Sequence, residues 1–248
     1  MKKFGLIGHP IAHSLSPALF KAAYDGKYAY DLIEGEDFET SYRRFIEEYD
    51  AINVTAPFKE AAFAKADILS EECASTGATN LLVKTPEGIK AYNSDFLGVR
   101  MWLSEVTEDL KGVKILIVGL GGAGKAAAAA AESLGMDVIR MNRTVRDSRT
   151  LPLDKFRECL READIMIYNI PAAIPELKEL TDSDFNEDKP KFMLEANYKD
   201  PSLRETMESF GSKAVYTGGE TWLLYQAMTG YKILTGEKPD LTKMSDVL

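Results

Sequence analysis

The alternation of apolar and polar segments along the chain predicts two successive α/β regions. In the first region, short apolar runs bounded by turn residues predict strands at residues 4–7, 28–33, 51–54, 81–83 and 89–92. Patterns typical of helices lie between and after these runs, at residues 17–24, 38–49, 60–69 and 95–106. Ser16 before Pro17 is typical of a helix N-cap followed by proline in the first turn.

The second region repeats a regular order of buried strand and helix. Its strands are predicted at residues 114–118, 137–141, 164–168, 192–194 and 214–216. Its helices are predicted at residues 125–134, 153–163 and 221–234. Residues 172–190 are rich in proline and acidic side chains, so we expect a mobile loop there. The order of elements places the protein in the α/β class.

Composition excludes several kinds of protein. The 248 residues are 45% hydrophobic and 28% charged, as in ordinary globular proteins. A net charge of −9 argues against a nucleic-acid or anionic-membrane partner. No apolar run approaches the roughly 20 residues of a membrane span. Two cysteines and two histidines without metal-ligand spacing predict no metal site, and we expect a cytoplasmic protein.

Two ionisable residues follow predicted strands of the first region. Lys59 comes just after residues 51–54, at the strand end where open α/β sheets place ligands, and a lysine there can exchange a proton with substrate. Asp95 begins a helix and could hold the ammonium of Lys59. The alternatives are a solvated surface lysine and a carboxylate favoured by the helix dipole.

Other polar residues suit a ligand that carries several hydroxyl groups. Ser14 and Ser16 share one loop after the first strand, and each hydroxyl can donate and accept a hydrogen bond. Asn80 stands at the start of a strand, and Gln226 lies on a C-terminal helix. Helix capping by Ser16, turn formation by Asn80 and a solvent-facing Gln226 are the alternatives.

A glycine-rich turn follows the strand at residues 114–118. Residues 119–124 read Gly-Leu-Gly-Gly-Ala-Gly and open an alanine-rich helix. Strand, tight turn and helix are the context in which G-x-G-x-x-G binds the pyrophosphate of a dinucleotide at a helix N-terminus. Tight packing between helix and strand is the alternative reading.

The loop after residues 137–141 favours NADP over NAD. A NAD-binding protein usually carries an acidic residue there, for the ribose hydroxyls. This chain instead has Asn142, Arg143 and Thr144, with Arg146 close by. Cationic and hydroxyl groups suit a 2′-phosphate, although a basic surface loop would have the same composition.

Taken in order, these motifs resemble the shikimate dehydrogenase family over nearly the whole chain. The matching segments are Gly8-x-Pro10-Ile11-x-His13-Ser14-x-Ser16-Pro17, Asn53-Val54-Thr55-x-Pro57-x-Lys59, Gly77-Ala78-x-Asn80, Tyr92-Asn93-x-Asp95-x-x-Gly98, Asn142-Arg143-Thr144 and Gly219 to Gln226. Departures from the family pattern occur at Phe20-Lys21, Asp147, Asn169-Ile170-Pro171, Glu195 and Trp222.

The resemblance implies an NADP-dependent oxidoreductase that interconverts 3-dehydroshikimate and shikimate, on the chorismate route to aromatic amino acids. It implies Lys59 and Asp95 as catalytic residues. The implied substrate residues are Ser14, Ser16, Thr55, Asn80, Tyr198 and Gln226. The implied cofactor residues are Gly119, Gly121, Gly122, Ala123, Asn142, Arg143, Thr144, Arg146 and Gly219.

The implied architecture has a substrate domain of residues 1–98 plus 220–248 and a Rossmann-like domain of residues 99–219. The C-terminal helices would return to the first domain, and the protein would be a monomer or homodimer. Two other functions stay open: a quinate/shikimate dehydrogenase with relaxed cofactor use, and a dinucleotide-binding sensor without catalysis. The presence of Lys59 and Asp95 argues against the sensor, which needs neither.

Overall fold

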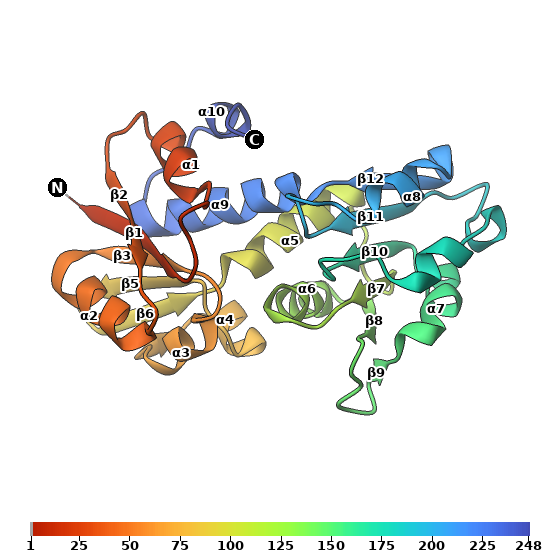
Figure 1. The fold of residues 1–248 in the computed structure, drawn as a ribbon, viewed down its shortest axis with the longest axis horizontal. Coiled ribbons are helices and arrows are strands. Elements are labelled where there is room, and N and C mark those ends of the chain that lie inside the picture. Colours follow the sequence, from red (N-terminus) through yellow and green to blue (C-terminus); the bar gives the residue numbers. More distant parts are fainter. Residues whose placement is uncertain (1) are drawn as a thin grey trace. The chain divides into compact units, whose positions relative to one another are not determined.

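The computed structural model of the protein describes residues 2–248, which divide into two compact units (Figure 1). The first unit comprises the chain up to Gly98 together with Leu224–Leu248, and the second is Val99–Leu223. The chain returns to the first unit inside a helix, whereas the sequence had placed this boundary after Gly219.

The first unit contains a mixed six-stranded sheet. Its strands, in the order β2-β1-β3-β5-β6-β4, are β1 (Lys3–Gly8), β2 (Ala29–Glu34), β3 (Ala51–Val54), β4 (Ile68–Leu69), β5 (Leu81–Thr85) and β6 (Gly88–Tyr92). The pairs of β1 with β2 and β3 are parallel, and the β5–β6 hairpin is antiparallel. The helices are α1 (Ser16–Ala23), α2 (Phe38–Glu48), α3 (Lys59–Ala64), α4 (Glu71–Thr76) and α10 (Leu241–Ser245).

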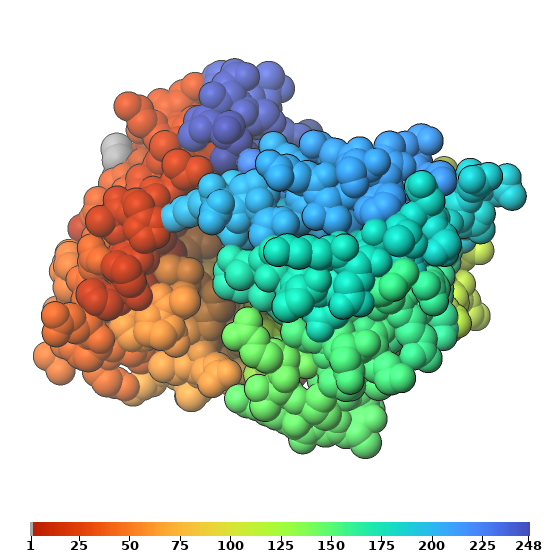
Figure 2. Space-filling view, turned by 45° about the vertical axis from the view of Figure 1, so that its right-hand side comes forward, coloured from red at the N-terminus to blue at the C-terminus, as the bar shows by residue number. Residues whose placement is uncertain are grey.

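The end of the chain packs onto its beginning within the first unit. Helix α10 lies against α1, as dark-blue and orange-red atoms show side by side in the space-filling view (Figure 2). Lys243 forms an ion pair of 2.7 Å with Asp25, which follows α1. The expected return of the C-terminal helices to the first unit is therefore confirmed.

The second unit contains a parallel six-stranded sheet. Its strands, in the order β12-β11-β10-β7-β8-β9, are β7 (Lys114–Val118), β8 (Asp137–Met141), β9 (Thr150–Leu151), β10 (Ile165–Tyr168), β11 (Lys191–Glu195) and β12 (Ala214–Thr217). The helices are α6 (Gly122–Ser133), α7 (Phe156–Glu162) and α8 (Arg204–Glu208), with short 3-10 turns η1 (Leu153–Lys155), η2 (Pro175–Glu179), η3 (Asp182–Asp184) and η4 (Gly211–Lys213). The strand order reverses between β7 and β10, as in dinucleotide-binding sheets. The α/β prediction with a Rossmann-like half is confirmed.

Two long helices run through the unit boundaries. They are α5 (Ser94–Val106) and α9 (Gly219–Thr235). At Gly98 a Cβ would lie 2.8 Å from the backbone nitrogen of Gln226, so glycine permits the close approach of the first-unit parts of α5 and α9. This contact brings Gln226 to the start of α5.

Three local predictions are wrong. Residues 60–69 do not form one helix, because α3 ends at Ala64 and the chain then forms β4. Residues 172–190, expected to form a mobile loop, instead contain the turns η2 and η3, and their side chains Ile174, Leu177 and Phe185 are buried. Ser16 is the first residue of α1 rather than its cap, and its side chain makes no capping bond.

Candidate active site

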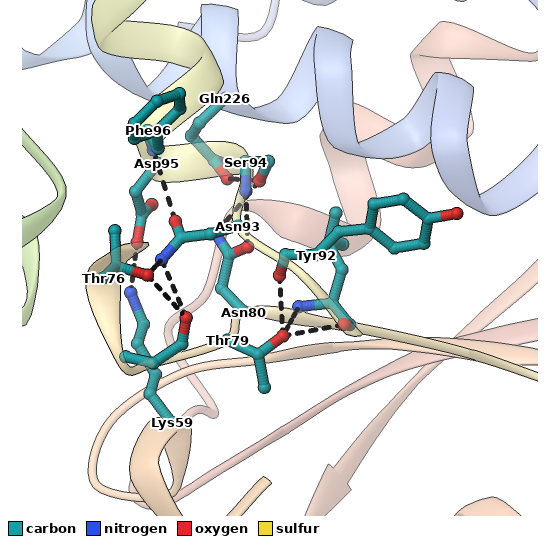
Figure 3. A network of polar contacts seen from close by, with 12 residues as sticks. Lys59, Thr76, Thr79, Asn80, Tyr92, Asn93, Ser94, Asp95, Phe96 and Gln226 are labelled. Carbon is teal, nitrogen blue, oxygen red and sulfur yellow. Dashed lines mark hydrogen bonds and ion pairs between the residues drawn. The ribbon is translucent and has the colours of Figure 1, made fainter. Parts of the chain in front are cut away.

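The structure brings Lys59 and Asp95 into direct contact. Lys59 is the first residue of α3, directly after the turn in which Phe58 donates its N–H to the carbonyl of Thr55 (3.0 Å). Its Nζ donates to Oδ2 of Asp95 (Figure 3). The two side chains are 24% and 16% exposed, so the pair is largely buried but open to a ligand. An ammonium held in this way can donate a proton to a carbonyl or accept one from a hydroxyl.

Asn93 fixes the start of α5 and hence the backbone of Asp95. Its Oδ1 accepts the N–H of Phe96 (3.2 Å), which makes Asn93 the N-cap of this helix. Its amide nitrogen donates to Oγ1 of Thr76 and to the carbonyl of Ala78, both at 3.0 Å. Asn93 is only 2% exposed, so these bonds satisfy a buried amide.

A second cluster joins Asn80, Ser94 and Gln226 (Figure 3). Asn80 accepts the N–H of Ser94 at 2.7 Å and donates to its hydroxyl at 3.0 Å. The Ser94 hydroxyl donates to Oε1 of Gln226 (3.2 Å), although the two residues are 132 positions apart. Two predicted residues, Asn80 and Gln226, therefore meet at Ser94, which directly precedes Asp95, the partner of Lys59. The sequence analysis missed Ser94. The one sequence feature that could have indicated Ser94 is its position directly before Asp95.

The two serines of the first loop contact each other. Ser14 Oγ accepts the N–H of Ser16 and donates to its Oγ, both at 3.2 Å. Ser14 therefore stabilises the turn into α1, and both hydroxyls stay half-buried. Thr55 is also half-buried in the first unit, and its N–H donates to the carbonyl of Ile7 (2.8 Å).

The glycine-rich turn has the form that a pyrophosphate requires. Gly119 has a φ of 87°, in the left-handed region. A Cβ on Gly124 would collide with the carbonyl of Gly119, so glycine permits the close packing of α6 on the turn. At Gly121 and Gly122 a Cβ would meet nothing within 4 Å, so there is open space at the N-terminus of α6. The N-cap of this helix is Gly121, which has no side chain to occupy that space. Backbone N–H groups facing such space suit an anion.

The loop after β8 is hydrogen-bonded to this turn and carries two exposed arginines. Asn142 Oδ1 accepts the N–H of Leu120 (3.4 Å), and its amide nitrogen donates to the carbonyl of Thr144 (3.2 Å). Arg143, Thr144 and Arg146 are exposed. Within residues 2–248 the structure records no hydrogen bond or ion pair on either arginine. Both guanidinium groups are available to a phosphate.

Three further residues of the second unit have structural environments of their own. A Cβ on Gly219 would lie 2.7 Å from the carbonyl oxygen of Ala196, so this glycine permits close packing. Burial raises the pKa of the half-buried Tyr198. Glu195 is fully buried and accepts from the N–H of Ser202 (2.6 Å) and the hydroxyl of Tyr216 (2.8 Å), so this departure from the family pattern has a structural role.

Comparison with known proteins identifies the family. Residues 6–82 match the family described as the shikimate dehydrogenase substrate binding domain. A relative from Staphylococcus aureus, named shikimate dehydrogenase (NADP(+)), is 32% identical over 98% of this chain and 96% of its own length.

The chain belongs to the shikimate dehydrogenase family.

Further comparisons agree with this membership. A shikimate dehydrogenase (NADP(+)) from Thermotoga maritima is 30% identical over 93% of this chain and 92% of its own length. The crystal structure of shikimate 5-dehydrogenase from Thermus thermophilus, in complex with NADP(H) and shikimate, has a TM-score of 0.81 and 27% identity, and the match covers 100% of this chain and 98% of that one. Residues 89–194 match the D-isomer specific 2-hydroxyacid dehydrogenase NAD binding domain. The resemblance that the sequence motifs indicated is confirmed.

No described helix, in residues 2–248, has the length and apolar character needed to cross a bilayer.

Proposed function

We propose that this chain catalyses the reversible, NADP-dependent interconversion of 3-dehydroshikimate and shikimate in the chorismate route to aromatic amino acids. The observation that carries the proposal is the contact of Lys59 with Asp95, beside the polar cluster of Asn80, Ser94 and Gln226. Relatives that match nearly the whole chain carry the names of this enzyme.

The residues of the first unit would bind the substrate and handle its proton. The ammonium of Lys59 donates a proton to the ketone oxygen during reduction and recovers it from the hydroxyl during oxidation. Asp95 holds that ammonium in place. The hydroxyls of Ser14 and Ser16 suit the substrate carboxylate, and Thr55, Asn80 and Gln226 of the same unit suit its ring and hydroxyls. A substrate role for Tyr198, which lies in the second unit, stays a prediction.

The residues of the second unit fit NADP. The open backbone around Gly121 and Gly122 suits the pyrophosphate, and the exposed Arg143 and Arg146 suit the 2′-phosphate. NADP, when bound, supplies or takes up the hydride. Gly119 and Gly124 set the shape of the turn, and Asn142 links it to the cationic loop. A cytoplasmic location and a monomeric or homodimeric state stay predictions.

The test is the initial rate of absorbance change at 340 nm with shikimate and NADP. A panel with quinate and with NAD distinguishes the alternatives. A kcat/KM for shikimate with NADP well above every other combination supports the proposal. Higher efficiency with quinate or NAD would favour the relaxed dehydrogenase, and binding of NADP without turnover of either acid would favour the sensor.

A further inference from the structure

Six aromatic side chains form a cluster in the first unit, next to the start of α1. They are Phe4, Phe20, Tyr24, Tyr28, Tyr30 and Tyr231. Phe20 is central, with ring centroids 4.6 Å from Tyr30 and 4.8 Å from Tyr231. Phe20 is one of the positions at which this chain departs from the family pattern. The packing of its buried ring orients the two neighbouring tyrosines.

The hydroxyls of these two tyrosines donate hydrogen bonds to residues outside the cluster. Tyr231, on α9, donates to the backbone carbonyl of Ser16 (3.1 Å). Tyr30, on β2, donates to Oδ1 of Asn53 (2.8 Å), in the strand that leads to Lys59. Burial raises the pKa of both tyrosines far above the usual value, and contact with Ser16 offsets only part of the rise. Both phenols therefore stay protonated and act as donors.

Ser16 is consequently held from two sides. Its N–H and hydroxyl are bound to Ser14, while its carbonyl is bound to Tyr231. The bond to Tyr231 spans 215 positions of sequence, so it links the start of α1 by a hydrogen bond to the C-terminal helix α9. Without it, the two serines would still contact each other but would lose this anchor to the rest of the first unit.

We propose that Tyr231 is a positioning residue for the substrate: its hydroxyl holds the Ser16 carbonyl and so presents both serine hydroxyls in one fixed geometry. This inference rests on the proposed function, in which those hydroxyls bind the substrate carboxylate. Tyr231 contacts the loop and not the reacting atoms, so its hydroxyl contributes equally to ground-state and transition-state binding. Loss of such uniform binding raises KM and leaves kcat unchanged.

The experiment compares Tyr231→Phe with Tyr24→Phe. Tyr24 belongs to the same cluster, but its hydroxyl contacts Thr235 (2.9 Å) and the carbonyl of Glu237 (3.2 Å) instead of the loop. Each variant thus loses one largely buried hydroxyl and keeps its ring. We expect Tyr231→Phe to raise KM for shikimate about 3- to 10-fold, the value of one neutral hydrogen bond, with kcat and KM for NADP unchanged. Tyr24→Phe should leave all three constants within twofold of wild type.

Amide hydrogen exchange of the peptide covering residues 11–17, measured without ligand, provides a readout that does not depend on turnover. We expect faster exchange in Tyr231→Phe alone. Equal exchange in both variants, or equal KM values for shikimate, would overturn the positioning role. If wild type failed to turn over shikimate with NADP, the proposed function would fall, and the exchange rates would still decide whether Tyr231 anchors the loop.

Discussion

Replacement of Lys59 by methionine tests the centre of the proposed mechanism. Methionine keeps an unbranched stem of similar length at the start of α3 and removes the ammonium that contacts Asp95. A general acid–base group contributes about 10²- to 10⁴-fold to the rate, which corresponds to about 3–5 kcal/mol of barrier. We expect kcat for shikimate oxidation to fall by this factor. KM for NADP should stay within about twofold, because the residues predicted to bind it lie in the second unit.

Stability should change far less than activity. The Lys59–Asp95 pair retains 24% and 16% side-chain exposure, and ion pairs that contact water contribute at most about 1 kcal/mol. Thermal unfolding of Lys59→Met should therefore remain cooperative, with a midpoint within a few degrees of wild type. This separates loss of chemistry from loss of fold.

Lys65→Met is the matched control. Lys65 is the C-cap of the same helix and pairs with the exposed Glu39 at 2.9 Å, so the same substitution removes a surface ion pair next to α3. In the rate assay at 340 nm, kcat and KM of Lys65→Met should equal those of wild type. A Lys59→Met enzyme with kcat within fivefold of wild type would refute the assignment of Lys59 as the proton-transfer residue.

Three further predictions concern other parts of the molecule. Arg143→Ala should weaken NADP binding about 10- to 100-fold and leave NAD binding unchanged in titrations, because only NADP offers a 2′-phosphate; equal weakening would contradict the assignment. Gln226→Ala should raise KM for shikimate but not for NADP in the same rate assay, since its amide contacts Ser94. Asp184→Asn should lower the free energy of unfolding in urea by about 2–4 kcal/mol at pH 7, because it breaks a buried contact with Arg157 (2.9 Å) and Arg161 (2.7 Å). Burial alone would raise the pKa of Asp184, but hydrogen bonds led by that of Arg157 lower it. The loss of unfolding free energy in Asp184→Asn should therefore persist above pH about 4 and shrink as the pH falls further. A loss that does not change with pH would exclude this ion-pair origin.

The buried strands could be predicted because their sequence and environment agree. The runs at residues 51–54, 114–118 and 137–141 are strands with these same bounds in the structure. The runs at residues 51–54 and 114–118 consist mostly of fully buried apolar side chains, for which a short apolar run between turn residues is a sufficient signal. The glycine turn was equally clear, since its spacing follows directly from the backbone contacts it makes.

Segments whose structure depends on distant contacts could not be predicted in the same way. Residues 172–190 resemble a mobile loop in composition, but Asp184 is fully buried against two arginines of α7. Ser16 has the sequence of an N-cap, yet its hydroxyl accepts from Ser14 and its carbonyl from Tyr231. Ser94 and Tyr231 were missed because hydrophobic periodicity describes one element at a time and says nothing about hydrogen bonds between elements.

Helix α9 shows how one element can determine both ends of the predicted substrate site. Gln226 and Gly230 are four residues apart, so they lie on one face of the helix, and both meet Ser94 there: Gln226 through a hydrogen bond and Gly230 through close packing. Tyr231 is five residues after Gln226, which at about 100° per residue turns it roughly 140° away, toward the carbonyl of Ser16. A small shift of this helix would therefore move the contacts of Ser94 and Ser16 together. The spacing of these side chains on one helix couples Ser94, which directly precedes the Lys59 partner Asp95, to the loop predicted to hold the substrate carboxylate.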